Sequence, residues 1–203
     1  MKLPPILKAG ILLFIFTAIS IFFVTLTQDS TQKRIKHNEA QLLIQRLGEL
    51  VKDYDNDILK DKFSKEINLH GIQQIIDIYP AKKKNKIFAY LIEHTYPNGY
   101  SGSIHLLTGV GVDKKLLGVR VIAHKETPGL GDKIELKKSN WIKQFKGLFL
   151  SNANKNQWKV KQDGGTFDAF TGATITPRAI VTATYQVLEL LNKPCPFSKK
   201  PCN

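Results

Sequence analysis

Cysteine is scarce in this 203-residue chain, and its position limits what the thiols can do. The two cysteines, Cys195 and Cys202, lie in the tail PCPFSKKPCN. No His, Asp or Glu lies close enough to them in sequence to suggest a metal site. A disulfide within the tail is one interpretation if the domain is exported, and two unrelated thiols are the other.

Arginine is also scarce, which limits how the positive charge can be interpreted. The formal net charge is +13, and the basic residues are 26 Lys and only 4 Arg. Proteins that read nucleic-acid sequence rely on Arg, whose guanidinium bonds guanine bidentately and stacks on bases. The lysines lack interleaved aromatic residues, so we expect a solvated basic surface and no nucleic-acid partner. A basic module for anionic lipid or nucleic acid is an alternative that salt-dependent binding would reveal.

Several common catalytic and nucleotide-binding motifs are absent. The sequence has no G-x-x-x-x-G-K-[ST] phosphate loop, no G-x-S-x-G nucleophile elbow and no C-x-x-C pair. Gly129-Leu130-Gly131 lacks the third glycine of a dinucleotide fingerprint, because Ile134 occupies that place. These absences exclude the corresponding enzyme classes, and we assign no catalytic residue.

The sequence does contain one long apolar run, from Ala9 to Gln28, without a charged residue. About 20 such residues span a bilayer as a helix, so we expect a transmembrane anchor at residues 9–28. A cleaved signal peptide is the alternative, although its apolar region is typically shorter, roughly 7–15 residues, and ends in small residues. Basic residues flank the run on both sides, so the positive-inside rule gives no orientation.

The pattern after the apolar run changes twice before residue 87. Apolar residues at helical spacing predict a helix from Thr31 to Val51. The charged stretch 53–61 is broken and predicts no regular element. At 71–79 the periodicity does not distinguish a strand from a short helix.

Three predicted strands follow, joined by tight turns. Short apolar runs bounded by turn signals mark them, at Ile87–His94, Ser103–Val112 and Leu116–His124. The Pro-Asn-Gly sequence within Tyr96–Gly102 marks the first turn. Consecutive strands with tight connections predict an antiparallel sheet.

Two helices and one further strand complete a predicted α+β fold. A short helix is expected at Asn140–Phe145 with Ser139 as its N-cap, and a strand is expected at Trp158–Asp163. Nearer the C-terminus, we expect Thr176 to cap a helix that has Pro177 in its first position. The apolar face of this helix is marked by Ile180, Ala183, Val187, Leu188 and Leu191.

Two loops carry residues that could bind a ligand. The first is HKETPGLGDKI, His124–Ile134. Its Gly129 and Gly131 permit positive φ and close approach by a flat ligand, and its backbone N–H groups could form an anion-binding nest. An ordinary connection between a strand and a helix is the alternative.

The second loop is DAFTGATITPRA, Asp168–Ala179, a threonine-rich turn before a helix N-terminus. Backbone donors and the helix dipole favour a phosphate at such a place, and a threonine hydroxyl there could bind it or be esterified to it. A turn followed by an N-cap is the alternative, since Thr is an ordinary capping residue.

Together the two loops resemble the FMN-binding domain family. Asp168–Thr174, DAFTGAT, matches the family's flavinylation signature D-x-x-[ST]-G-A-T throughout, and His124–Gly131 looks like its second motif. With YPNGYSGSIHLL, the Trp141 segment and the N-terminal run, the pattern is similar to the G subunits of Rnf (Rsx) electron-transport complexes. The C subunits of sodium-pumping NADH:quinone reductases share both motifs but are usually longer.

The resemblance implies that a flavin transferase attaches FMN through its phosphate to the last threonine of the signature, here Thr174. It also implies a cofactor site made of Glu126, Thr127, Gly129, Leu130, Gly131, Asp168, Thr171, Gly172 and Ala173. The acid of the signature, Asp168, would serve the attachment reaction. No metal site is implied.

The resemblance further implies a non-catalytic electron carrier in a complex that couples ferredoxin and NAD redox chemistry to ion movement. Its partners would be the other subunits and membrane lipid, with the flavin domain on the periplasmic side of a bacterial inner membrane. A flavin-free structural subunit is the alternative. The expected regions are a cytoplasmic N-terminus at 1–8, a single-pass anchor at 9–28, a helical stalk and the start of the exported domain at 29–86, an FMN-binding domain at 87–192 and a tail at 193–203.

Overall fold

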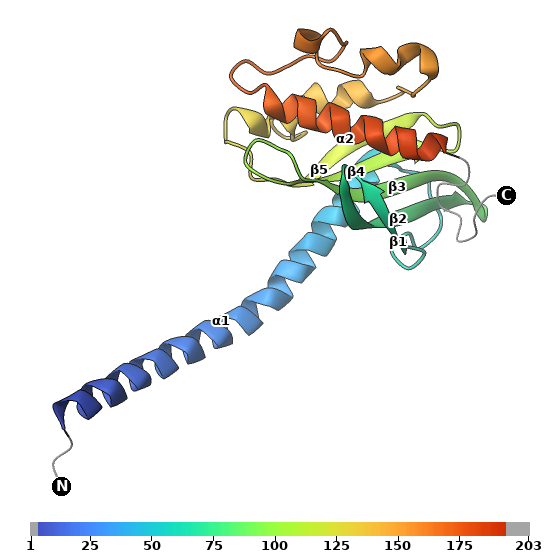
Figure 1. Cartoon of the computed structure of the whole chain (residues 1–203). Helices are drawn as coiled ribbons and strands as arrows, with labels where there is room; N and C mark the ends of the chain where they lie inside the picture. The colour runs from blue at the N-terminus through green and yellow to red at the C-terminus, as the bar shows by residue number, and fades with distance from the viewer. Residues whose placement is uncertain (1–3, 194–203) are drawn as a thin grey trace. The chain divides into compact units, whose positions relative to one another are not determined.

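The computed structural model describes residues 4–193, apart from the side chains of residues 29, 30, 33, 36 and 39. The chain divides into two compact units, Met1–Ile44 and Gln45–Asn203, which we describe separately. The first is part of one long helix, and the second contains a sheet with further helices (Figure 1). Cys195 and Cys202, and with them the question of a disulfide, lie outside the described residues.

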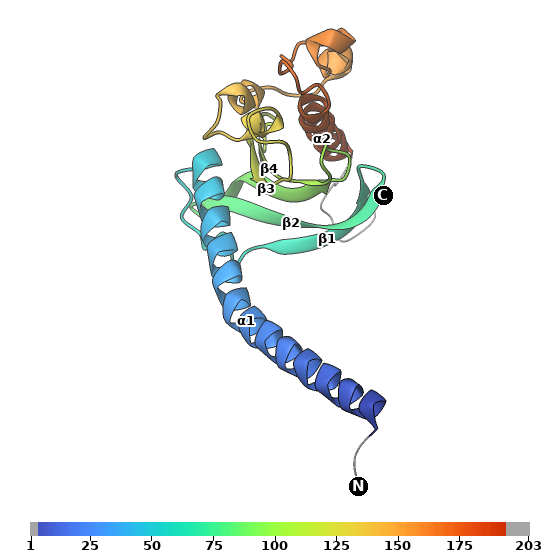
Figure 2. The same ribbon diagram turned by 90° about the vertical axis from the view of Figure 1, so that its left-hand side faces the viewer.

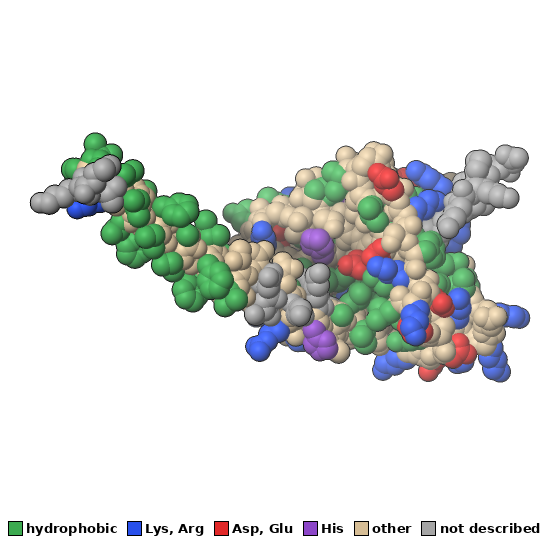
Figure 3. All heavy atoms as spheres, turned by 90° about the horizontal axis from the view of Figure 1, so that it is seen from below, with side chains coloured by type: hydrophobic (Ala, Val, Ile, Leu, Met, Phe, Trp, Pro, Cys, Tyr) green, Lys and Arg blue, Asp and Glu red, His purple; other side chains and the backbone are tan. Residues whose placement is uncertain are grey.

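The first unit consists of the N-terminal part of α1, Pro5–Leu50, and this helix confirms the one expected at Thr31–Val51. Within it, Pro5–Gln28 is long and apolar enough to cross a membrane, with a mean hydropathy of 2.5. At about 1.5 Å per residue this segment spans about 36 Å, and a hydrocarbon core is about 30 Å thick. Its apolar side chains are exposed (Figure 3). Three hydroxyls in it donate to carbonyls one turn earlier and need no water, those of Thr17, Thr25 and Thr27.

The second unit is built on a five-stranded antiparallel sheet whose strands follow in sequence order. The strands are β1 Phe63–Leu69, β2 Ile72–Lys83, β3 Lys86–Tyr96, β4 Ile104–Gly111 and β5 Leu116–Ala123. The three strands expected from the sequence are confirmed as β3, β4 and β5. The ambiguous segment 71–79 belongs to β2, so the sheet begins well before residue 87.

Helix α2, Ile175–Asn192, covers one face of this sheet (Figures 1 and 2). Its predicted apolar face is buried, as are the side chains of the strands that point toward it. Side chains alternate between the two faces of a strand, so every second residue of β4 meets the helix. Burial of each large aliphatic side chain here stabilises the fold by roughly 1.5–3 kcal/mol. The β4 residues in this core are Ile104, Leu106 and Val110.

The last turn of α1 packs on the opposite face of the sheet. Gly109 and Gly118 are partners across β4 and β5, and Leu50 occupies the space that their missing side chains leave. A Cβ atom on Gly118 would lie 2.9 Å from Leu50 Cδ2, and this glycine has a φ of +148°. On the same face, Arg120 Nε donates to Glu49 Oε2 at 2.7 Å. Packing and an ion pair therefore fix the end of α1 to the sheet.

Four short 3-10 helices lie between β5 and α2. The short helix expected at Asn140–Phe145 is confirmed as the second of them, a 3-10 helix. Its N-cap is Asn140 rather than the expected Ser139, whose hydroxyl accepts a hydrogen bond from the Trp141 amide at 3.1 Å. The strand expected at Trp158–Asp163 is wrong, because Val160 forms only a single bridge with Phe167 and the chain then turns. The four are η1 Gly131–Ile134, η2 Trp141–Phe145, η3 Asn152–Gln157 and η4 Lys161–Asp163.

Two buried histidines link the strands to α2 through a chain of hydrogen bonds. His70 Nδ1 bonds to Gln186 Oε1 of α2, and His70 Nε2 bonds to His94 Nδ1 at 2.9 Å. His94 Nε2 bonds to Thr108 Oγ1 at 2.9 Å. With both rings neutral, each nitrogen can be matched with one donor or one acceptor. Burial lowers the pKa of both histidines, and the neighbouring His70 and His105 lower the pKa of His94 further.

We expect the free energy of unfolding to decrease as the pH falls below about 6.5, the ordinary pKa of histidine. The folded chain lowers the pKa of His70 and His94, so their contribution is fully present above that pH and is lost as the folded pKa is approached. Protonation of His94 in the unfolded chain should by itself lower the free energy of unfolding by about 1 kcal/mol between pH 7.5 and 5.5. Urea unfolding of the detergent-solubilised protein at both pH values measures this. The His94→Gln protein should depend less on pH, and equal pH dependence would contradict the prediction.

Candidate functional site

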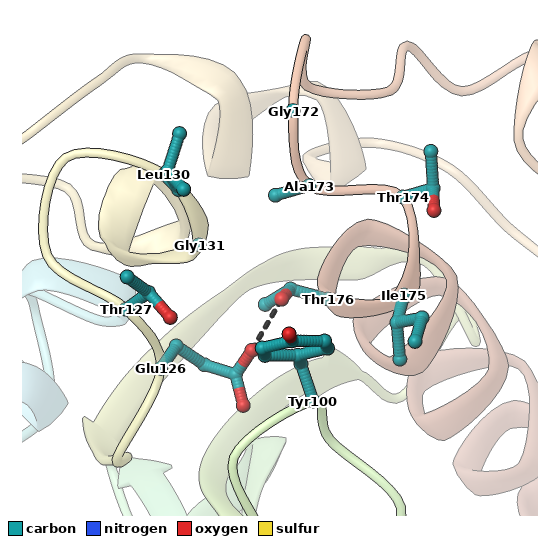
Figure 4. Close-up of a pocket in the computed structure, with 10 residues that line it drawn as sticks. All are labelled: Tyr100, Glu126, Thr127, Leu130, Gly131, Gly172, Ala173, Thr174, Ile175 and Thr176. Atoms are coloured by element: carbon teal, nitrogen blue, oxygen red, sulfur yellow. Dashed lines mark hydrogen bonds between the residues drawn. The ribbon is translucent and has the colours of Figure 1, made fainter.

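A pocket of about 270 Å³ opens between the turn after β3, the loop after β5 and the N-terminus of α2 (Figure 4). Seven of the residues expected at the cofactor site line it, together with three others. Only one lining residue is charged, a glutamate, and none is a cation. The lining consists of Tyr100, Glu126, Thr127, Leu130, Gly131, Gly172, Ala173, Thr174, Ile175 and Thr176.

Glu126 joins the three segments that form the pocket. Its side chain is only 4% exposed. Oε1 accepts a hydrogen bond from the Ser101 amide at 3.0 Å, and Oε2 accepts one from the Thr176 hydroxyl (Figure 4). Both partners are neutral, so hydrogen bonds rather than an opposite charge compensate for the burial of this carboxylate.

Two glycines allow the three segments to approach one another so closely. A Cβ atom on Gly131 would lie 2.9 Å from Thr176 Oγ1, and one on Gly99 would lie 2.7 Å from Glu126 Oε1. A larger residue at either position would displace the carboxylate or the threonine. Glycine is therefore needed at position 131 because there is no room for a side chain.

The loop after β5 uses its backbone donors internally. The amides of Leu130 and Gly131 donate to the Thr127 carbonyl at 3.2 and 3.0 Å. Gly129 has a φ of +79°, which allows the turn, and its amide bonds to the Asp132 carboxylate and lowers the pKa of that group. These donors close the loop on itself, so the anion nest expected here is directed at the loop's own carboxylate and carbonyl.

Thr174 lies at the N-terminus of α2 with its side chain exposed. Its hydroxyl makes no capping hydrogen bond, although Thr174 occupies the N-cap position. The expectation that Thr176 caps the helix is wrong, because α2 begins at Ile175 and the Thr176 hydroxyl is directed to Glu126 instead. Pro177 is thus the third helical residue, where its missing N–H still costs no intrahelical bond.

Three expected site residues lie outside the pocket lining. Gly129 shapes the loop, Thr171 is exposed, and Asp168 pairs with Lys161 on the surface at 2.5 Å. The backbone carbonyl of Asp168 accepts a hydrogen bond from Trp141 Nε1 at 2.7 Å, which holds the signature against η2.

Sequence reasoning missed Tyr100 and Ile175 and gave Thr176 another role. The signal for Tyr100 was its place beside the Pro-Asn-Gly turn, but no local pattern shows that this turn faces α2. Hydrogen bonds between distant segments, such as Thr176 to Glu126, leave no local spacing in the sequence.

Two family models and several known proteins match the chain. Residues 99–189 match the family model of the FMN-binding domain, and residues 1–50 match that of the RnfG N-terminal region. The G subunit of the ion-translocating oxidoreductase complex of Shewanella baltica is 42% identical over 196 residues, which is 93% of this chain and 90% of that protein. The chain belongs to the family of these G subunits.

Other members of this family are similar over comparable lengths. The protein from Vibrio cholerae is 40% identical over 94% of this chain and 92% of its own. The protein from Pseudoalteromonas atlantica is 45% identical over 88% of this chain and 84% of its own. All ten lining residues of the pocket lie within the matched FMN-binding domain.

The pocket combines exposed apolar side chains with the N-terminus of a helix. Tyr100, Leu130 and Ile175 are 65%, 42% and 43% exposed and offer apolar surface to a flat ring. The N-terminus of α2 favours a phosphate beside Thr174. Ligand pockets usually measure roughly 300–1,000 Å³, so a volume of about 270 Å³ would leave part of a flavin outside. FMN, the ligand named by the matched family model, would therefore fill this pocket only with part of its structure.

We expect Thr176→Val to reduce the free energy of unfolding by about 1–3 kcal/mol, because the buried Glu126 carboxylate loses one of its two donors. Thr176→Ser retains the hydroxyl and should cost less. The double variant Glu126→Gln/Thr176→Val should lose less free energy of unfolding than the two single variants together, since the two groups interact directly. Urea unfolding of wild type, the three single variants and the double variant measures these differences, and a Thr176→Val protein as stable as wild type would contradict the assignment.

Proposed function

We propose that this protein is the membrane-anchored electron carrier of an ion-translocating oxidoreductase complex and that it holds FMN as a phosphoester of Thr174. The observation that carries the proposal is that Thr174 is exposed beside the pocket and that its hydroxyl makes no capping hydrogen bond. When bound, FMN accepts one or two electrons and so connects one-electron and two-electron carriers. The chain's own residues position it and set its surroundings.

The attachment needs an accessible hydroxyl and room around it. Thr174 Oγ1 forms the bond to the flavin phosphorus, the hydroxyl proton passes to a base, and the leaving group of an activated flavin donor departs within the transferase. Gly172 has a φ of +82° and Ala173 is small, so the turn leaves the phosphate unobstructed. Asp168 is exposed and can be reached by the transferase, which supports a role in the attachment reaction.

The composition of the pocket supports a covalent rather than a dissociable cofactor. Free FMN carries a phosphate with about two negative charges near pH 7. The pocket offers that phosphate the dipole of α2 and no cationic side chain, and its one charged residue, Glu126, has the same sign. Helix-terminus interactions contribute about 0.3–1 kcal/mol each, too little to retain a dissociable nucleotide at low concentration. A phosphoester supplies the retention that the pocket lacks.

The family resemblance and α1 support a place in a membrane complex. Pro5–Gln28 provides a single membrane anchor, and its continuation ends on the flavin domain. We propose the bacterial inner membrane with the domain on the periplasmic side, and the other subunits of the complex as redox partners. Membrane lipid surrounds the anchor, and a flavin transferase acts during maturation.

We expect a yellow-green fluorescent band at the mass of this protein when native membranes are denatured in detergent and separated on a gel. Thr174→Ala should abolish the band, because the phosphoester has no oxygen to form on. Intact mass of the wild-type protein should increase by one FMN less one water. Dialysed Thr174→Ala protein should retain no flavin.

Thr182→Ala is the matched control, because Thr182 is a half-buried threonine of α2 that lies outside both the signature and the pocket lining. It should fluoresce like wild type. A dark wild-type band from a host that flavinylates other proteins would reject the covalent cofactor and favour a flavin-free structural subunit.

We expect a C-terminal fusion to alkaline phosphatase to be active and a matched fusion to β-galactosidase to be inactive. Alkaline phosphatase needs disulfides, which form outside the cytoplasm. The opposite pattern of the two activities would place the domain in the cytoplasm.

A further inference from the structure

More than half of the protein's net charge lies in one short region, the lysine-rich segment 136–162. This segment contains seven Lys and no Asp, Glu or Arg. It therefore contributes +7 of the net +13, and the other 176 residues contribute +6. Positive charge is thus concentrated in this segment, whereas positive and negative charges are more nearly balanced in the rest of the chain.

Most of these lysines have no acidic partner to neutralise them. Lys138 pairs with Asp132, and Lys161 pairs with Asp168. Lys159 is close enough to lower the pKa of the Asp163 carboxyl, which also binds an arginine. Within residues 4–193 no ion pair forms at the other four, which are the exposed Lys137, Lys143, Lys146 and Lys155.

An apolar notch lies in the same segment. A hollow of about 120 Å³ is lined by side chains that include Trp158, Phe167 and Phe149. Phe149 is 48% exposed and Leu148 is 37% exposed, whereas Trp158 and Phe167 are buried. The hollow is large enough for one aliphatic or aromatic side chain rather than for a nucleotide. Buried aromatic residues within an exposed rim are typical of anchor pockets in protein interfaces.

The notch is held in shape by its surroundings. The Leu116 amide donates to the Leu148 carbonyl at 2.8 Å, and the Gly147 amide donates to the Leu116 carbonyl at 2.7 Å, which ties this stretch to β5. The rings of Trp158 and Phe167 lie 5.3 Å apart between centroids. In both ribbon views the orange turns that contain η3 lie farther from the strands than α2 does (Figures 1 and 2). The notch is therefore preformed and on the outside of the domain.

We propose that the lysine-rich segment docks onto an acidic protein surface of another subunit, which inserts one apolar side chain into the notch beside Phe149. This inference rests on the proposed place in a membrane complex. Unpaired lysines attract and orient an acidic partner over a Debye length of about 8 Å at physiological salt. The notch fixes the register once contact is made. The segment also contains Trp141, which holds the Asp168 carbonyl, so the docked surface adjoins the signature that carries Thr174.

Site-specific photo-crosslinking in native membranes tests this docking. A benzophenone amino acid at position 149 should form an adduct with an acidic segment of another subunit, identified by mass spectrometry. The same probe at Ile75, a 71% exposed residue of β2, serves as the positional control and should not form that adduct. High KCl should reduce the yield at position 149, because the attraction is electrostatic.

Charge-reversal variants distinguish an effect of this particular surface from an effect of the protein's net charge. K143E/K146E/K155E should lower the yield at position 149 by about fivefold or more. K83E/K84E/K86E changes the net charge equally at the hairpin between β2 and β3 and should leave the yield unchanged. Adducts only with lipid, no adduct, or equal losses from both triple variants would overturn the proposal. Flavin fluorescence of the same bands reports separately on the proposed function.

Discussion

The pocket depends on one hydrogen-bonded carboxylate, Glu126. It receives the Ser101 amide from one segment and the Thr176 hydroxyl from another, and it lies in the loop that forms the third wall. No backbone ladder connects these three segments at this point, so side-chain bonds must set their spacing. A buried carboxylate with only neutral partners tolerates little displacement, because each lost donor exposes a full desolvation cost. The position of Thr174, two residues before Thr176, follows from this constraint.

The threonine hydroxyls at the start of α2 do not cap the helix. A threonine at the start of a helix ordinarily turns its hydroxyl to a free amide of the first turn. Here the Thr176 hydroxyl is committed to Glu126, and the Thr174 hydroxyl at the N-cap makes no capping bond. The first turn of α2 therefore retains unsatisfied donors beside an available hydroxyl. That combination suits a phosphoester at Thr174 better than it suits the stability of the helix alone.

Local patterns predicted α1, α2 and the strands β3 to β5, left β2 undecided between strand and helix, and did not predict β1. They failed where distant segments decide the structure. The strands β3 to β5 and the apolar face of α2 follow from periodicity and turn residues, which are local. The strand expected at Trp158–Asp163 did not form, because Val160 makes only a single bridge with Phe167 before the chain turns into η4. Motif resemblance named seven residues of the pocket, but Tyr100 could not be predicted, since only the tertiary fold brings its turn to α2. The need for glycine at positions 109 and 118 could not be predicted from the sequence either, because it arises from the packing of Leu50 against them.

The electrostatic character of the domain is divided between two regions, and this division fits an electron carrier. The pocket contains one buried negative charge and no cationic side chain, so only the dipole of α2 favours an anion there. The lysine-rich segment carries most of the net positive charge at the surface. A cofactor held by a covalent bond needs no electrostatic attraction at its site, which leaves the surface charge free to select a partner. If Thr174 carries the flavin as we propose, retention of the cofactor and recognition of the partner are governed by different residues and can be altered independently.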